Sequence, residues 1–426
     1  MQRKQKHETT LTYARSMDKK DALAPFRKQF LFPRIKGKPA IYMIGNSLGL
    51  QPKTTKSIIN EELDDWALLA GEGHVHARRP WLTYHKQAKK TLATLVGAQT
   101  DEVVAMHQLT VNLHLMMVSF YNPTATRYKI ITEAGAFPSD QYAFESQLKF
   151  HGINPDDGLI ELEPRKGEYI LRTEDILDAI RQHGPEIALV IFGGVQYYTG
   201  QFFNIRSISK AAHDAGAIVG FDLAHAIGNV PLSLHEDEVD FAVWCSYKYL
   251  NSGPGGIAGA FVHNKHARDF SRPRFAGWWG HNEKERFQMK KGFQPMPGVD
   301  GWQLSNVPIL QAAAHLASLE IFRKAGISRL RKKSITLTGY LEYLLGAIDP
   351  EKKHFEILTP VNPDERGCQL SIFLKHDGRK IFTSIQKRAI IGDWRDPDVI
   401  RLAPAPLYNS FEDVFKLCEV FKQILK

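Results

Sequence analysis

The stretch that decides the fold of this chain is residues 220–250, GFDLAHAIGNVPLSLHEDEVDFAVWCSYKYL. Two short apolar runs, 217–221 and 241–245, are each followed by polar side chains that an apolar core would not accommodate. Ligands bind at the carboxyl ends of strands in open parallel sheets. We therefore expect two strands whose ends bring four polar side chains into one crevice. These are Asp222 and His225 after the first run, and Tyr247 and Lys248 after the second.

The pair of Asp222 and Lys248 favours pyridoxal 5'-phosphate (PLP) as a cofactor. In PLP chemistry a lysine bonds to the cofactor, and an acidic side chain keeps the pyridine nitrogen protonated so that the ring withdraws electrons. The two residues are 26 positions apart (248 − 222), long enough for the chain to leave one strand, cross over and return on another. Either residue alone is compatible with a solvated strand end. Together with the motifs below, they predict a PLP site.

Two motifs in this region resemble those of a known enzyme family. The segment SYKYLNSGPGGIAGAF, which contains Lys248, and the segment FDLAHA, which contains Asp222, look like those of kynureninase. That family consists of fold-type I PLP enzymes of the aspartate aminotransferase superfamily. The resemblance extends from about Ile44 to Asn409. It implies an α/β fold with a large domain, built on a mostly parallel seven-stranded sheet, and a smaller α+β domain.

The resemblance and the length of the chain predict three parts. A chain of 426 residues is too long for one simple core. We expect residues 1–70 to form an N-terminal segment that packs with the small domain. Residues 71–305 should form the large PLP-binding domain, and residues 306–426 the small domain. An amphipathic helix expected over 306–322 would link the two.

Local patterns predict a strand–helix–strand unit before Asp222. The apolar run 187–192 is typical of a strand buried on both faces. Asn204 is a favoured N-cap residue, and the helix after it should stop at Gly216. The strand that ends at Asp222 follows, so we expect a parallel crossover. Other expectations are a helix over 54–70, a helix break near Pro25, strands at 41–44, 128–132, 356–358 and 369–373, and a capping box at Ser410 and Asp413.

Several cofactor contacts are implied by the resemblance. Leu109 and Thr110 precede an apolar helical pattern, and a helix N-terminus can bind a phosphate; Thr110 is also compatible with a plain N-cap. By resemblance, these two residues hold the cofactor phosphate. The motif FPSD supplies a Phe that covers the pyridine ring and polar residues near the ring edge, namely Phe137, Ser139 and Asp140. Where the family often has Ser, this chain has Gly193, so that side-chain contact to the phosphate is absent.

Substrate contacts and a partner subunit are also implied. Arg401 lies between Ile400 and Leu402 in a short strand, where an arginine is costly to bury without an anion. The family uses this position for the substrate α-carboxylate; the alternative is an internal ion pair. The resemblance puts Ser47 of the GNSLG loop near the active site and His74 against the aromatic ring of the substrate. Trp278 and Asn306 would reach the cofactor phosphate of a neighbouring subunit, which implies a homodimer with shared active sites.

The implied reaction is hydrolysis of the Cβ–Cγ bond of L-kynurenine or L-3-hydroxykynurenine. The products are anthranilate or 3-hydroxyanthranilate plus L-alanine, within tryptophan degradation and NAD biosynthesis. In this reading Lys248 carries PLP and moves the α-proton, Asp222 keeps the ring protonated, and His225 orients Asp222 or the ring edge. Tyr247 bonds the phosphate and acts as a general acid. The group of His74, Ser305 and Asn306 resembles the variant of the family that favours the 3-hydroxylated substrate.

Composition excludes several other classes of protein. The net charge is +9, from 55 basic and 46 acidic residues, but the basic residues are scattered, so no nucleic acid partner is expected. No apolar run approaches the ~20 residues that a membrane helix needs. The polar start MQRKQKHETTLTY predicts no secretory signal. Cys245, Cys368 and Cys418 are spread apart, which argues against a disulfide framework or a zinc site, and a cytoplasmic location follows as an expectation.

Three alternatives remain open from the residues alone. His74 and His76 could contribute to a metal site, but no carboxylate or Cys cluster is nearby. A second fold-type I enzyme, such as a cysteine desulfurase or an aminotransferase, is possible, although a desulfurase needs a mobile, exposed cysteine. Cys368 precedes a strand-like run and Cys418 lies on the apolar face of a helix. A basic scaffold without catalysis is disfavoured by the joint presence of Asp222, Lys248 and Arg401.

Overall fold

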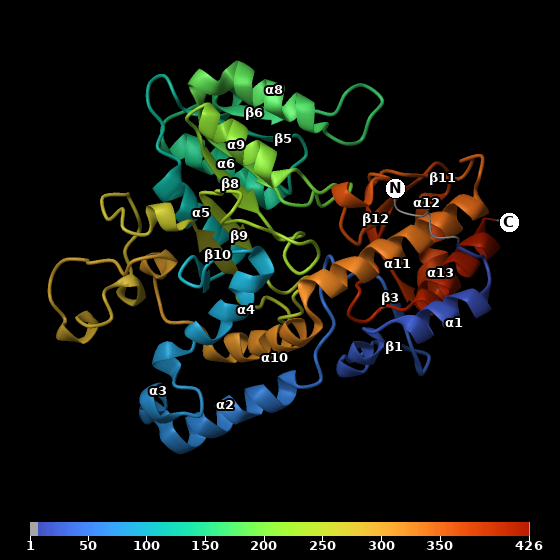
Figure 1. The fold of residues 1–426 in the computed structure, drawn as a ribbon, viewed down its shortest axis with the longest axis horizontal. Helices are drawn as coiled ribbons and strands as arrows, with labels where there is room; N and C mark the ends of the chain where they lie inside the picture. Colours follow the sequence, from blue (N-terminus) through green and yellow to red (C-terminus); the bar gives the residue numbers. More distant parts are fainter. Residues whose placement is uncertain (1–6, 426) are drawn as a thin grey trace.

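The computed structural model describes residues 7–425 as two bodies that lie side by side (Figure 1). The larger body surrounds a seven-stranded sheet, and the smaller one surrounds a four-stranded sheet. His7 and Leu425, the first and last described residues, both pack within the smaller body. Residues 1–6, part of the polar start from which no secretory signal is predicted, lie outside the described residues. Among residues 7–425, no helix has the length and apolar character required to cross a membrane.

The larger sheet has the strand order β4-β10-β9-β8-β7-β5-β6. Strand β10 runs antiparallel to both of its neighbours, and the other pairs are parallel. The expected mostly parallel seven-stranded sheet is therefore confirmed. Its strands are β4 (Val103–Ala105), β5 (Lys129–Glu133), β6 (Leu159–Leu162), β7 (Ile187–Gly193), β8 (Ile218–Asp222), β9 (Phe241–Trp244) and β10 (Gly259–Val262).

Helices cover both faces of this sheet, which is why its strands read as continuous apolar runs. One face packs against helices α4, α8, α9 and α10, and the other packs against α5 and α6. The helices are α4 (Lys86–Val96), α5 (Leu109–Phe120), α6 (Pro138–Phe150), α7 (Pro155–Gly158), α8 (Thr173–His183), α9 (Ile205–Asp214) and α10 (Ile309–Ala325).

The strand–helix–strand unit before Asp222 is confirmed. Strand β7 contains the apolar run 187–192, and β8 pairs with it in parallel, so that Gly193 lies opposite Asp222. Between them, the side chain of Asn204 accepts a hydrogen bond from the backbone N–H of Ser207 and caps α9. Gly216 follows the helix with a left-handed φ of 72°, a conformation that favours glycine. This unit places Asp222 at the carboxyl edge of the sheet.

The smaller body is an antiparallel sheet covered by helices. Its strand order is β11-β12-β15-β14, and the predicted capping box at Ser410 and Asp413 is present at the start of its last helix. Strand β13 (Ile390–Ile391) pairs in parallel with β3 (Ile41–Tyr42) near the N-terminus. The main elements are β11 (Phe355–Ile357), β12 (Leu370–Leu374), β14 (Asp393–Arg395), β15 (Val399–Leu402), α11 (Ile327–Ile348), α12 (Gly378–Lys387) and α13 (Phe411–Ile424).

The N-terminal residues contact both bodies. Helix α1 (Leu11–Lys20) packs against α13, whereas α2 (Thr55–Leu69) packs against α10. Within α11, Leu330 belongs to the large buried cluster, whereas Leu337 belongs to the smaller one. The boundaries at residues 70 and 305 stay predictions. Short elements complete this region: β1 (Arg34–Ile35), β2 (Lys38–Pro39) and α3 (Gly73–His76).

Some predicted bounds differ from the structure for local reasons. The helix expected over 306–322 begins at Ile309, because Pro308 occupies its N-cap and fixes the entry of the chain. The strand expected over 41–44 is shorter, since only Ile41 and Tyr42 pair with β13. The helix break expected near Pro25 is present: α1 ends at Lys20, and Pro25 lies in a separate 3-10 turn.

Candidate active site

A pocket opens at the carboxyl ends of β5, β7, β8 and β9, where the sheet topology brings together residues far apart in sequence. Nine of the predicted site residues line it: Leu109, Thr110, Phe137, Ser139, Asp140, Asp222, His225, Tyr247 and Lys248. The pocket also includes residues that the sequence reasoning did not assign as ligand contacts, namely Glu133, Gly193, Val195, Tyr197, Ala224 and Cys245. The convergence follows from strand order, because the parallel strands end at one edge.

Two carboxyl groups and one amine form the charged centre of the pocket. Asp140 is 6% exposed and Lys248 is 9% exposed. Burial raises the pKa of Asp140, and the neighbouring charge of Asp222 raises it further. Burial also raises the pKa of Asp222, but the charge of Lys248 and a hydrogen bond with Asp140 oppose that effect. The arrangement therefore puts a proton on Asp140 and a negative charge on Asp222, next to the cation.

Neutral side chains surround this centre. Burial lowers the pKa of His225, and the charges of Lys248 and Arg401 lower it further, so the imidazole is neutral. Burial raises the pKa of Tyr247, with a smaller contribution from Cys245, so the phenol keeps its proton. A neutral Tyr247 can donate a hydrogen bond or a proton to a ligand.

The aromatic ring of Phe137 faces the lysine. The Nζ atom of Lys248 lies 5.5 Å from the centre of that ring, and the Phe137 side chain is 38% exposed. The ring of Tyr197 meets it edge-on, with ring centres 5.1 Å apart. An aromatic face that is free on the pocket side can stack on a planar ligand.

Helix α5 points its N-terminus into the same pocket. Gln108 is the N-cap of this helix, and its side chain makes no capping hydrogen bond. Thr110 lies inside the first turn, so the alternative in which Thr110 is merely the N-cap is wrong. The backbone N–H groups of the first turn and the Thr110 hydroxyl form an anion site of the kind that binds a phosphate.

Arg401 lies behind the pocket in β15 and is 1% exposed. It forms an ion pair with Asp393 and donates a hydrogen bond of 2.7 Å to the carbonyl oxygen of Tyr197. The internal ion pair that we named as an alternative is thus present. The Nε atom of Arg401 has no hydrogen-bond partner among residues 7–425. The guanidinium therefore keeps capacity to bind a carboxylate.

The loop that contains Ser47 packs against the lysine segment. The backbone N–H of Gly49 donates a 2.8 Å hydrogen bond to the carbonyl oxygen of Tyr247. A Cβ atom at Gly49 would overlap the carbonyl oxygen of Lys248 and the side chain of Asn251, so the close approach requires glycine. Ser47 itself does not line the pocket, and its place near the active site stays a prediction.

Besides Ser47 and Arg401, four more predicted residues do not line the pocket within a single chain. His74, Trp278, Ser305 and Asn306 are all exposed. The ring of His74 meets Trp81 edge-on at 5.4 Å, and the indole N–H of Trp278 donates a hydrogen bond of 3.1 Å to the carbonyl oxygen of Arg286. The roles assigned to these four residues at the pocket stay predictions.

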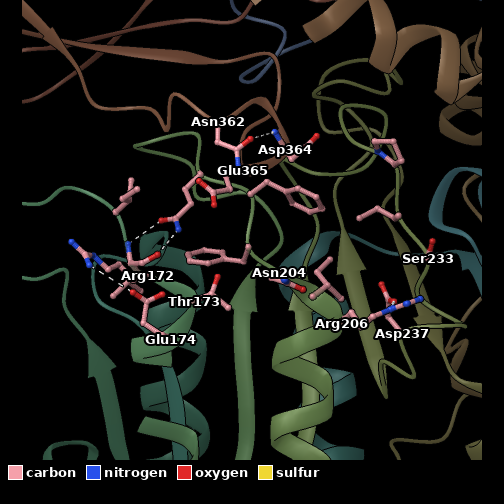
Figure 2. Close-up of a pocket in the computed structure, with 18 residues that line it drawn as sticks. Arg172, Thr173, Glu174, Asn204, Arg206, Ser233, Asp237, Asn362, Asp364 and Glu365 are labelled. Carbon is pink, nitrogen blue, oxygen red and sulfur yellow. Dashed lines mark hydrogen bonds and ion pairs between the residues drawn. The ribbon is translucent and has the colours of Figure 1, made fainter. Parts of the chain in front are cut away.

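A larger cavity, of about 770 Å³, lies elsewhere, between the starts of α8 and α9 and the loop 362–365 of the smaller body (Figure 2). Its two arginines already have partners. Arg172 pairs with Glu168 and also with Glu174. Arg206 pairs with Asp237 at 2.7 Å, and Figure 2 shows the pairs with Glu174 and Asp237. It lacks the buried amine and carboxyl groups that the smaller pocket contains. Its size alone therefore does not make it the catalytic site.

The residues of the smaller pocket fit PLP on their own chemistry. The Nδ1 atom of His225 and the Oδ1 atom of Asp140 are buried and have no hydrogen-bond partner among residues 7–425. Buried polar atoms without partners are costly, and a polar ligand would satisfy them. A buried amine, a carboxylate, an aromatic face and a helix N-terminus match the aldehyde, the ring nitrogen, the ring face and the phosphate of PLP.

Comparison with known proteins extends this result. Residues 330–421 match the family model described as the kynureninase C-terminal domain. Solved structures with the same fold include a cysteine desulfurase from Thermococcus onnurineus, with a TM-score of 0.75 and 17% identity, covering 90% of this chain and 94% of that one. The cysteine desulfurase CsdA from Escherichia coli gives a TM-score of 0.75 at 16% identity, covering 95% and 98%. At such identity the likeness shows the fold alone.

Proteins of similar sequence identify the family to which this chain belongs. The kynureninase of Flavobacterium psychrophilum is 54% identical over 417 residues, which is 98% of this chain and 98% of that protein. The kynureninase of Myxococcus xanthus is 54% identical over 416 residues, 97% of each chain. Identity at this level over almost the whole length, together with the buried pocket around Lys248, shows that the chain belongs to the kynureninase family.

Proposed function

We propose that this chain catalyses the PLP-dependent hydrolytic cleavage of the Cβ–Cγ bond of L-kynurenine, giving anthranilate and L-alanine. The observation that carries the proposal is the buried group of Lys248, Asp222 and Asp140 in one pocket of a kynureninase-family chain. When bound, PLP supplies an electron sink that stabilises negative charge on the substrate carbon. The residues of the chain hold the cofactor, orient the substrate and transfer protons.

Each charged residue has a defined task in this proposal. Lys248 holds the cofactor and then, as a free amine, moves the proton of the substrate α-carbon. Asp222 presents a negative charge to the ring nitrogen, and Asp140 supplies a hydrogen bond to that carboxylate. The phenol of Tyr247 donates a proton during cleavage, because its raised pKa keeps it protonated near neutral pH.

Arg401 binds the substrate α-carboxylate in this proposal. Its present counterion is Asp393, so the substrate must replace one oxygen of that carboxylate or add to the free Nε side. A bidentate arginine–carboxylate contact fixes both the position and the direction of the substrate.

We also propose a preference for L-3-hydroxykynurenine, supported by His74, Ser305 and Asn306. These exposed polar side chains are suited to a ring hydroxyl, and a site built for a hydroxyl penalises the analogue that lacks it. The test is the ratio of kcat/KM for the two substrates in the wild type and in Asn306→Ala. A higher kcat/KM for L-kynurenine in the wild type would remove this part of the proposal.

A homodimer with shared active sites is part of the proposal. The segment 264–304 projects from the large sheet (Figure 1) and carries five exposed apolar side chains: Phe270 at 54%, Phe275 at 56%, Trp278 at 48%, Phe287 at 59% and Met289 at 71%. Exposed apolar groups gathered on one segment favour an interface.

Subunit complementation tests the shared site. Lys248→Ala and Asn306→Ala each damage every site in their own homodimer. After mixing, a mixed dimer with sites built from both chains would contain one intact site. Random mixing should then restore about a quarter of the wild-type activity. Activity that does not rise above the sum of the two variants would contradict sharing.

The cytoplasmic location, the roles in tryptophan degradation and NAD biosynthesis, and the absence of a nucleic acid partner stay predictions. The three cysteines of the chain are buried and unpaired, which suits a reducing compartment. The same burial leaves no exposed cysteine for desulfurase chemistry.

The first test of the proposed function is an absorbance spectrum of the purified protein with PLP, before and after L-3-hydroxykynurenine is added. We expect a band near the visible edge that shifts with substrate, and a fluorescent aromatic amine in the filtrate. A band without the amine would support the cofactor but not the reaction. The absence of any band would remove the role of Lys248.

A further inference from the structure

One acidic residue of the pocket has no role in the proposed reaction. Glu133 is the last residue of β5 and is 4% exposed. Both of its carboxylate oxygens face the backbone N–H of Gly193, at 3.2 and 3.3 Å, and its Oε2 atom accepts a 3.2 Å hydrogen bond from the Thr132 hydroxyl. The carboxyl group is therefore held in one place by two neighbours.

Gly193 lies in close contact with the Glu133 carboxyl group. It is the last residue of β7, and its register partner on β8 is Asp222. A Cβ atom at position 193 would lie 3.0 Å from Oε1 of Glu133, closer than ordinary side chains approach. The glycine thus leaves the space that the Glu133 carboxyl group occupies, next to the strand end that carries Asp222.

The surroundings make the charge of Glu133 sensitive to pH. Burial raises the pKa of Glu133 to about 7, the hydrogen bonds from Gly193 and Thr132 oppose that effect, and the charge of Asp222 adds to it. Its charge in turn raises the pKa of Asp140 on α6. The other titratable groups that line the pocket are His225, Cys245, Tyr247, Lys248 and Tyr197.

We propose that Glu133 is a positioning residue of the cofactor site, whose charge acts through Asp222 to strengthen the binding of PLP with a protonated ring nitrogen. The inference rests on the proposed function, because it requires PLP in this pocket. An anionic Glu133 adds negative charge beside Asp222, and this stabilises a cation bound to that carboxylate. Protonation of Glu133 removes this contribution.

The test compares PLP affinity in the wild type and in Glu133→Gln as a function of pH. The Kd of PLP is measured by titration of the apoprotein, followed by the visible band. We expect the ratio of the variant Kd to the wild-type Kd to be near one at about pH 6 and to rise on the order of tenfold by about pH 8. The ratio cancels the titration of PLP itself. A ratio that stays constant across this range overturns the proposal.

A second variant gives a result that a purely structural role would not produce. Thr132→Val removes the hydroxyl that stabilises the charged form of Glu133, so the change in affinity should move to higher pH. An unmoved transition counts against the proposal, even if Glu133→Gln does not fold. The matched control is Glu102→Gln, another buried glutamate that accepts backbone hydrogen bonds, from Gln99 at 2.7 Å and Asn264 at 2.8 Å, outside the pocket.

The outcomes separate the two proposals. If wild-type protein forms no visible band with PLP, the proposed function fails. If the band forms and Glu133→Gln and Glu102→Gln show the same flat ratio, only the role of Glu133 fails. A ratio that rises with pH in Glu133→Gln and stays flat in Glu102→Gln supports the role.

Discussion

Arg401 and Asp393 face each other as register partners on neighbouring strands, and their side chains form an ion pair in the interior. The residue proposed to bind the substrate carboxylate thus already holds a carboxylate. The carboxylate of Asp393 and the carboxylate of the substrate would therefore compete for the same guanidinium.

Replacing Asp393 by Asn should therefore lower the stability of the folded protein and leave the Arg401 guanidinium free to bind a ligand carboxylate. The change leaves the buried Arg401 without its counterion, and breaking a buried pair by removing one partner costs about 3–5 kcal/mol. Arg395 shares the same carboxylate and loses a contact of 3.2 Å. We expect a lower thermal midpoint that L-alanine raises more in the variant than in the wild type. Equal shifts by L-alanine in both proteins would argue against carboxylate binding at Arg401.

Replacing Lys248 by Ala should abolish turnover. The residue is proposed both to hold PLP and to move a proton, and the second task alone is worth about 10²–10⁴ in rate. We expect at least about a thousandfold loss of product formation, measured by anthranilate fluorescence. Lys248→Arg serves as the control, because it keeps the charge but not the nucleophile. Borohydride reduction of the wild type followed by peptide mass spectrometry should mark Lys248; a label elsewhere would contradict the assignment.

The two aspartates of the pocket should respond differently to amide replacement. Asp140 carries the proton of the pair, so Asp140→Asn resembles its neutral state, whereas Asp222→Asn removes the negative charge. We expect kcat to fall on the order of a hundredfold or more in Asp222→Asn and by less than about tenfold in Asp140→Asn. Similar losses in the two variants would show that the proton is not held by Asp140.

Gly49 should be intolerant of even a methyl group. A Cβ atom there would overlap the carbonyl oxygen of Lys248, so Gly49→Ala should displace the lysine segment. We expect a clear loss of PLP affinity in a spectroscopic titration. Gly71→Ala is the control, because no atom lies within 4 Å of a Cβ at that position. Equal PLP affinity in both variants would mean that the loop yields without disturbing Lys248.

Acid stability should depend on Asp240, which lies away from the pocket. Burial alone would raise its pKa, but hydrogen bonds from His213 and His266 and the charge of Lys265 hold the pKa well below its ordinary value. A depressed carboxyl pKa stabilises the fold at pH values above the unfolded pKa, near 4, and this stabilisation is lost as the pH falls toward the folded pKa. We expect Asp240→Asn to lower the unfolding free energy by about 2–4 kcal/mol at neutral pH.

Urea unfolding at several pH values measures this effect. The difference between wild type and Asp240→Asn should shrink as the pH falls below about 4. A difference that is independent of pH would point to lost packing instead of the carboxylate charge.

The sequence by itself determined the fold class and the main catalytic candidates. The apolar runs that end at Asp222 and just before Lys248, the capped helix between β7 and β8, and the capping box at Ser410 are local patterns. They depend on residues within one or two turns or one strand, so periodicity and composition reveal them. The resemblance added the family, which the relatives confirm.

Only the tertiary structure decided which side chains meet. Glu133 and Tyr197 reach the pocket because β7 lies beside β8 and β5 lies beside β7, and strand order is set by long-range packing that a local pattern does not encode. The position of Glu133, directly after an apolar run, is visible in the sequence. Its contact with Gly193 is not. The Arg401–Asp393 pair likewise depends on the register of two antiparallel strands. Local sequence patterns predict which residues are buried and where the chain turns. Which distant residues come into contact depends on how the whole sheet packs.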